Sequence, residues 1–283
     1  MPHIMEILGK TRVMVKDGKV IEAGKPQITW CPLWNKASGI EEITKESAIR
    51  NMEQRIKDFG MFTPGRRLDL GVFASFGISE IMMTALGRGL IDSTVTVCDG
   101  AGTVVTSNPE LVQGMSAQIS GLIETEPISE VIEAIHERGG YVLDPESARI
   151  DQAAGLELAA SKGYTRIAVS VVDVNSATRV LEMKQKLGIE VIIMAAHVTG
   201  MSNDDAVEFL TQVDVITGCA SKKIRELVQP LIQVGTAIPL FGLTPKGKEL
   251  LIERAKDIES PLMINTMALP VLPEEKQPKP LIN

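Results

Sequence analysis

The second half of the chain alternates short, near-continuous apolar runs with helical segments. The apolar runs cover residues 166–172 and 190–196, and the helical segments cover residues 151–162, 175–187 and 203–212. Strands that are apolar on both faces are typical of parallel sheets, because helices cover both sides of such a sheet. Gly163 and Gly188, directly after two of the helical segments, favour helix ends there. We therefore predict an α/β fold with a mostly parallel sheet built from βαβ units.

The N-terminal segment has a different pattern, with apolar and polar residues alternating on both sides of Asp17 and Gly18. An Asp-Gly pair between two such runs is typical of a β-hairpin with a type I′ turn, because both turn residues need positive φ. We expect two lobes that meet near residue 150. The predicted division is an N-terminal hairpin, Cys loop and helix (1–58), a first α/β lobe (59–150), a second α/β lobe (151–269) and an extended tail (270–283).

The composition excludes several classes of partner. The 283 residues carry 29 basic and 36 acidic side chains, a net charge of −7, and no run of Lys or Arg. Such a chain lacks the basic surface that attracts nucleic acids and anionic membranes. No apolar stretch reaches the length of about 18 residues that predicts a membrane span, and no signal peptide is expected. The odd number of cysteines, 3, argues against a disulfide framework and favours a reduced, cytoplasmic location.

Reactive side chains follow the predicted strands at the points where those strands end. They are Cys98, Asp99, Asp173, His197 and Cys219. In open α/β sheets ligands bind outside the carboxyl ends of the strands, so parallel strands would bring these five side chains to one edge. The alternative is structural, because polar residues after strands also cap helices and cysteines also act as small buried hydrophobes.

The candidate metal ligands are Cys31, Cys98 and Cys219. Three thiolates suit an iron–sulfur cluster or a zinc ion and leave one coordination position open for chemistry. No Cys-x-x-Cys pair occurs, so this expectation requires the fold to bring three distant residues together. In this interpretation His197, Asp99 and Asp173 are the catalytic residues and transfer protons. A further possibility is a cysteine nucleophile, Cys219 or Cys98, activated by His197.

A short glycine loop follows Cys98. Backbone N–H groups of Gly100, Gly102 and Thr103 would bind an anionic group of a cofactor if they point outward. The loop lacks the third glycine of a dinucleotide-binding fingerprint, and the chain contains no P-loop motif. The alternative is an ordinary tight turn.

Several longer segments together carry a family resemblance. They are residues 59–64 (FGMFTP), 80–86 (EIMMTAL), 98–103 (CDGAGT), 108–114 (NPELVQG), 218–221 (GCAS) and 233–239 (QVGTAIP). In these segments the chain resembles the methanogenesis marker protein 8 family, over nearly the whole length apart from the proline-rich tail. The resemblance implies an archaeal, cytoplasmic protein linked to methanogenesis. It suggests methyl-coenzyme M reductase, the nickel cofactor of that enzyme or its maturation proteins as partners, and it assigns no catalytic residue.

Two functions therefore stay open. The first is a thiolate-centred metalloenzyme, with an iron–sulfur cluster or zinc, that acts on a small molecule or cofactor. The second is a non-catalytic assembly or cofactor-handling factor for methyl-coenzyme M reductase. Bound iron and acid-labile sulfide would favour the first, and a stable complex with reductase subunits without metal would favour the second.

Overall fold

The computed structural model describes residues 2–72 and 74–283, and its larger sheet has eight strands in this part of the chain. They are β4 (Ser93–Cys98), β5 (Gly102–Thr106), β7 (Tyr141–Val142), β8 (Arg166–Val171), β9 (Glu190–Ala195), β10 (Val215–Thr217), β11 (Ile232–Val234) and β12 (Leu240–Gly242). The order across the sheet is β11-β12-β10-β9-β8-β4-β5-β7. The central strands β4, β8, β9 and β10 are parallel to their neighbours in this group, as the apolar runs predict.

The prediction of a mostly parallel sheet is wrong, because the outer pairs are antiparallel. These pairs are β4 with β5, β5 with β7, β10 with β12 and β11 with β12. Only residues 99–101 connect β4 to β5, and so short a turn can only reverse the chain, since a parallel neighbour needs a crossover of a dozen residues or more. The chain is therefore a mixed α/β protein with a parallel centre.

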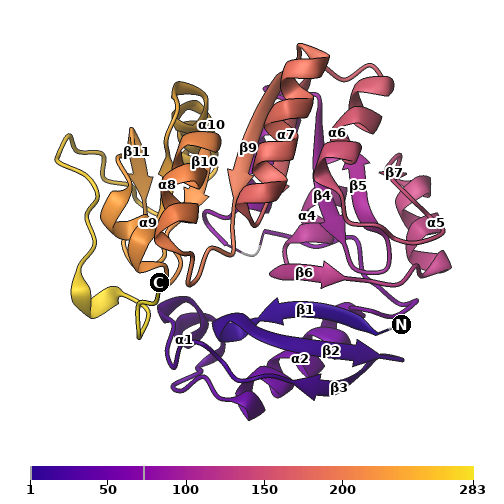
Figure 1. The fold of residues 1–283 in the computed structure, drawn as a ribbon, viewed down its shortest axis with the longest axis horizontal. Helices are drawn as coiled ribbons and strands as arrows, with labels where there is room; N and C mark the ends of the chain where they lie inside the picture. The colour runs from indigo at the N-terminus through magenta and orange to yellow at the C-terminus, as the bar shows by residue number, and fades with distance from the viewer. Residues whose placement is uncertain (1, 73) are drawn as a thin grey trace.

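A smaller, antiparallel sheet lies across the bottom of the molecule in Figure 1. Its strands are β1 (His3–Ile7), β2 (Thr11–Lys16), β3 (Lys19–Ala23) and β6 (Gly121–Glu124), in the order β3-β2-β1-β6, and the 3-10 turn η1 (Leu8–Lys10) joins β1 to β2. The predicted hairpin is confirmed: β2 pairs with β3 across Asp17 and Gly18, whose φ angles are 51° and 68°. Strand β6 was not expected here, because it comes from the segment predicted as the first α/β lobe.

Helices cover both faces of the eight-stranded sheet. They are α3 (Ile78–Gly87), α4 (Pro109–Ser116), α5 (Ser129–Glu137), α6 (Gln152–Ser161), α7 (Val174–Leu187), α8 (Asn203–Gln212), α9 (Lys222–Leu227) and α10 (Pro245–Ala255). Successive residues of β8 explain the layering, since Val169 belongs to the core cluster that contains residues of α6–α9 and Ala168 belongs to the cluster that contains residues of α3, α4 and α10. The smaller sheet packs against α1 (Pro32–Ser38) and α2 (Lys45–Phe59).

The predicted boundary near residue 150 does not divide the molecule. Strand β4 precedes this position and β8 follows it, yet the two pair in parallel within one sheet. Segments 59–150 and 151–269 therefore share a common sheet.

The C-terminal tail, residues 270–283, contains the 3-10 turn η2 (Glu274–Lys276) and no α-helix or named strand. Lys279 forms a β-bridge with Trp30, and Ile282 forms one with Ser221. These bridges place the C-terminus beside α1, where the smaller sheet meets the larger half of the molecule (Figure 1).

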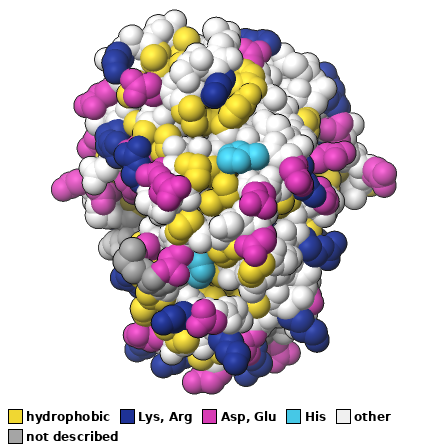
Figure 2. Space-filling model, turned by 90° about the vertical axis from the view of Figure 1, so that its right-hand side faces the viewer, with side chains coloured by type: hydrophobic (Ala, Val, Ile, Leu, Met, Phe, Trp, Pro, Cys, Tyr) yellow, Lys and Arg dark blue, Asp and Glu magenta, His cyan; other side chains and the backbone are white. Residues whose placement is uncertain are grey.

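The surface agrees with the charge balance of the sequence. Figure 2 shows acidic and basic side chains interspersed over one face of the molecule, without a broad basic area on that face. No helix in residues 2–72 and 74–283 is both long and apolar enough to span a membrane.

Candidate functional site

The parallel strands place the predicted site residues along one edge of the larger sheet. Cys98 and Asp99 lie at the end of β4, Asp173 lies after β8, His197 after β9 and Cys219 after β10. Neighbouring strands are about 4.8 Å apart, so the ends of β4 and β10 are separated by about 14 Å. The five residues therefore share an edge without forming a single cluster.

A polar cavity of about 420 Å³ lies at this edge, beside the ends of β8 and β9. We call it the carboxyl-edge pocket, and it is lined by Lys10, Val172, Asp173, Val174, Asn175, His197, Val198, Thr199, Gly200, Met201, Ser202, Asp205 and Glu208. Its size is in the range of small-molecule sites. Of the predicted catalytic residues, His197 and Asp173 line this pocket, whereas Asp99 does not.

His197 is held by the smaller sheet, across the junction between the two sheets. Its Nε2 lies 2.9 Å from Oε2 of Glu6 in β1. Glu6 is directly opposite Gly121 of β6, and a Cβ atom at position 121 would lie 2.5 Å from Cδ2 and 2.6 Å from Nε2 of His197. The absent side chain at Gly121 therefore provides the space that the imidazole occupies beside Glu6.

The electrostatics of this pair favour an ionised Glu6. Burial by itself raises the pKa of Glu6, but the hydrogen bond with His197 and the charges of His197, Lys10 and Arg12 outweigh it and lower the pKa. With Glu6 ionised, Nε2–H of His197 donates the hydrogen bond. In the neutral imidazole the other nitrogen, Nδ1, then keeps its lone pair, and no described residue hydrogen-bonds to it.

The backbone at His197 is also unusual, because its φ is +60°. Non-glycine residues rarely adopt this left-handed conformation, and where they do the strain often accompanies a functional role. Lys10 fixes the loop that follows, since its Nζ donates to the backbone oxygen of Thr199 over 2.8 Å. The imidazole is thus positioned by its own backbone, by Glu6 and by Gly121.

Asp173 caps a helix, which is the structural role that was the alternative to a catalytic one. It is the N-cap of α7, where its carboxylate accepts hydrogen bonds from the backbone N–H and the hydroxyl of Ser176, over 2.9 and 2.7 Å. Asp205 lies in the first turn of α8, where its carboxylate accepts a hydrogen bond from the hydroxyl of the N-cap residue Ser202 over 2.7 Å. These carboxylates stabilise helix ends at the wall of the pocket.

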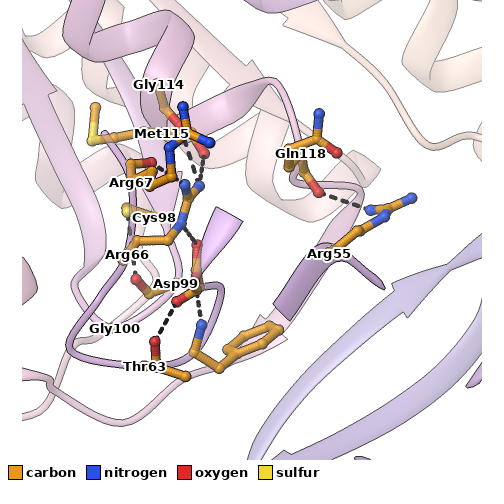
Figure 3. A network of polar contacts seen from close by, with 12 residues as sticks. Arg55, Thr63, Arg66, Arg67, Cys98, Asp99, Gly100, Gly114, Met115 and Gln118 are labelled. Carbon is orange, nitrogen blue, oxygen red and sulfur yellow. Dashed lines mark hydrogen bonds and ion pairs between the residues drawn. The ribbon is translucent and has the colours of Figure 1, made fainter. Parts of the chain in front are cut away.

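Asp99, predicted to be catalytic, is instead the centre of a buried ion pair (Figure 3). Nε of Arg66 donates to Oδ1 of Asp99 over 2.8 Å, and neither side chain is exposed to solvent. Oδ2 of Asp99 accepts the backbone N–H of Phe62 over 2.6 Å. Arg66 also donates to the backbone oxygens of Arg67, Gly114 and Met115. The pair therefore fastens the loop of residues 60–67 to β4.

The glycine loop after Cys98 is an ordinary, tightly packed turn. The N–H of Gly100 donates to the hydroxyl of Thr125, and the N–H of Thr103 donates to the backbone oxygen of Arg149. A Cβ atom at Gly102, whose φ is +68°, would lie 2.0 Å from the backbone oxygen of Ala148. Because protein groups occupy this space, Gly100, Gly102 and Thr103 do not form the predicted cofactor cradle.

The three cysteines do not come together as a ligand set. Cys98 is fully buried at the end of β4, where burial and the charge of Asp99 raise the pKa of its thiol. Cys31 and Cys219, by contrast, lie within electrostatic range of each other and of Arg225. In residues 2–72 and 74–283, no group of three or more His, Cys, Asp and Glu side chains is arranged to hold a metal ion. The residues therefore do not fit the predicted three-cysteine iron–sulfur or zinc site.

Sequence reasoning did not identify Glu6, Lys10 or Gly121 as site residues. Glu6 and His197 are 191 positions apart, and no local pattern shows that β1 lies below the edge of the larger sheet. Gly121 follows Ser120 at the start of a short strand and has no motif around it. The alternation of side chains along β1 places Glu6 and Ile4 on the same face of the strand. This was the only available signal for the direction of the Glu6 side chain.

Comparison with known proteins identifies relatives of the whole chain. Residues 3–256 match the family described as "Uncharacterized protein conserved in archaea (DUF2099)". The chain is also 46% identical, over 283 residues and 99% of both chains, to "Uncharacterized protein MJ0054" of Methanocaldococcus jannaschii. Both matches include the strands that build the carboxyl-edge pocket. The chain belongs to this archaeal family, DUF2099.

Proposed function

We propose that the carboxyl-edge pocket binds a small polar molecule and that His197 transfers a proton to or from it. The observation that carries this proposal is the hydrogen bond between His197 and Glu6, for which the missing side chain at Gly121 leaves room. A carboxylate behind an imidazole fixes its tautomer and stabilises the imidazolium that forms when it accepts a proton. Glu6 is then a positioning residue and His197 the acid–base group.

The surroundings support a small polar ligand over an apolar one. The pocket wall contains Lys10 and the polar residues Asn175, Thr199 and Ser202. Its carboxylates, Asp173, Asp205 and Glu208, already accept hydrogen bonds from Ser176, Ser202 and Gln212 respectively. A cavity of about 420 Å³ has room for a metabolite-sized molecule and for little more.

A ligand screen by thermal unfolding tests this proposal. A ligand at 100 times its Kd stabilises the protein by about 2.7 kcal/mol, which raises the Tm of a chain of this length by roughly 4 °C. We expect a small polar compound to give such a shift. The matched variant is Asn175→Trp, because Asn175 lines the pocket from an exposed position and the larger side chain would fill it. An equal shift in Asn175→Trp, or no shift with any polar compound, contradicts the proposal.

A second candidate is an assembly factor, and an exposed apolar segment favours it. Met263 and Ile264 are 91% and 92% exposed, and Leu262 and Met267 are 49% and 58% exposed. Apolar side chains that are gathered and exposed in this way are typical of surfaces that bind another protein. The link to methanogenesis, with methyl-coenzyme M reductase or its maturation proteins as partners, remains a proposal from the family resemblance. Binding of purified reductase to the wild type and not to Ile264→Asp would support it, whereas no binding to the wild type would refute it.

A further inference from the structure

A buried arginine beside two thiols lies apart from the carboxyl-edge pocket. Arg225 in α9 is only 3% exposed. Its Nε donates to the backbone oxygens of Gly218 and Cys219 over 2.9 and 2.7 Å, and Nη2 donates to that of Ala237 over 2.7 Å. The remaining nitrogen, Nη1, is buried and has no partner among the described residues.

Arg225 also has no carboxylate partner in the described part of the chain. Burial lowers the pKa of this guanidinium, and a negative charge on Cys219 or Cys31 would oppose that change. A buried charge without a counter-charge is costly, so its surroundings normally supply one. Here the groups able to become anions next to the guanidinium are the two thiols.

The C-terminal tail links the segments that carry these two cysteines, although they are distant in sequence. Cys31 shares a core cluster with Ala220, the residue that follows Cys219. The C-terminal tail fastens both segments, since Lys279 pairs with Trp30 and Ile282 pairs with Ser221. Lys279 and Ile282 are only three residues apart, at most about 10 Å of extended chain, so one short piece of the tail contacts both segments.

The two thiols differ in accessibility. Cys219 is half-buried, and its Sγ lies 3.2 Å from the hydroxyl oxygen of Thr217. Cys31 is 8% exposed, and burial raises the pKa of its thiol. Cys219 is therefore the thiol that a reagent reaches first, and its backbone oxygen accepts a hydrogen bond from Nε of Arg225. Cys31 lies behind it as a protonated thiol.

We propose that Cys219 and Cys31 are a redox-active dithiol that reduces a small-molecule disulfide. The Cys219 thiolate attacks one sulfur of the disulfide, a new S–S bond forms, and the other half leaves as a thiolate that takes up a proton. Sγ of Cys31 then attacks Sγ of Cys219, and the second half leaves with the proton of Cys31. The external disulfide gains two electrons, and the protein keeps a bond between Cys31 and Cys219.

The test treats the reduced protein with 2-hydroxyethyl disulfide and analyses it by mass spectrometry without reduction. The variant Cys98→Ala contains only the two proposed thiols, and we expect it to lose both and to show a peptide with Cys31 linked to Cys219. Cys31→Ser should instead accumulate a stable mixed disulfide at Cys219. Cys219→Ser should remain unmodified, because Cys31 and Cys98 are buried.

Arg225 is tested by rate. In Arg225→Gln the reaction of Cys219 should slow by about tenfold, which corresponds to a loss of about 1.4 kcal/mol in the interaction between the guanidinium and the thiolate. Arg225→Lys should keep most of the rate. A mixed disulfide that persists in Cys98→Ala, or a Cys219 that does not react, overturns the proposal, as does an unchanged rate in Arg225→Gln. None of these results depends on whether the carboxyl-edge pocket binds a ligand.

Discussion

Removing the charge of Asp99 should destabilise the whole protein. The Arg66–Asp99 pair is 2.8 Å long and fully buried on both sides. Burial lowers the pKa of the Arg66 guanidinium, but the charge of Asp99, the charge of Cys98 and the hydrogen bond with Asp99 together outweigh burial and raise the pKa, so Arg66 stays protonated. In Asp99→Asn the guanidinium would remain buried without a counter-charge.

The size of this destabilisation depends on the hydrogen-bond partners that Arg66 would keep in Asp99→Asn. Removing one member of a buried pair typically costs 3–5 kcal/mol. Arg66 keeps its hydrogen bonds to three backbone oxygens, and the asparagine oxygen still accepts the N–H of Phe62. We therefore expect a loss at the lower end, about 3 kcal/mol of the free energy of unfolding, which is a large share of the 5–15 kcal/mol of a typical protein.

Urea unfolding followed by tryptophan fluorescence measures this loss, since Trp30 and Trp34 report on the N-terminal half. The control is Asp69→Asn, which removes an ion pair with Arg138 whose carboxylate is 69% exposed. Exposed pairs contribute about 0–1 kcal/mol. If Asp99→Asn unfolds within 1 kcal/mol of the wild type, the reasoning that Asp99 is a structural anchor is wrong.

Other changes test the support of His197 and the packing of the turn. Gly121→Ala places a Cβ atom about 2.5 Å from the His197 ring. It should therefore lower the free energy of unfolding in urea by about 1–3 kcal/mol and abolish ligand-induced thermal shifts. The control is Gly87→Ala, whose Cβ would have nothing within 4 Å and which should be neutral or slightly stabilising. Because the folded-state pKa of Glu6 is lowered from 4.5, its contribution to stability is complete above that pH and is lost as the pH falls through the lowered value. Glu6→Gln should therefore show a weaker loss of stability below about pH 4.5 than the wild type, and parallel pH profiles would contradict this. Gly102→Ala should destabilise by more than about 1 kcal/mol through backbone strain alone, and an unchanged urea midpoint would count against the packed turn.

The sequence predicted the centre of the fold because the signals there are local. The apolar runs that became β8 and β9 are buried on both faces, and Asp17 and Gly18 specify their turn through positive φ. Cys98, Asp173, His197 and Cys219 were placed on one edge by the parallel direction of their strands. Each of these inferences needed only residues close together in the chain.

The remaining features depend on contacts between distant segments. The pairing of β1 with β6 joins residues more than a hundred positions apart, and it creates both the Glu6–His197 contact and the space at Gly121. Asp99 was misassigned because a carboxylate at the end of a strand can face either a pocket or a buried arginine. Only the position of Arg66, brought in by the loop of residues 60–67, decides between them.

The central claim is that His197 performs acid–base chemistry in the carboxyl-edge pocket, and turnover of the ligands found by thermal unfolding tests it most directly. Each ligand would be incubated with the wild type, His197→Gln and Glu6→Gln, and its conversion followed by NMR spectroscopy. General acid–base groups contribute about 10²–10⁴-fold to rate. We predict that His197→Gln still binds the ligand but converts it at least about 100-fold more slowly, with a smaller loss in Glu6→Gln. Conversion by His197→Gln at the wild-type rate, or ligands that bind the wild type and are never converted, would contradict the account.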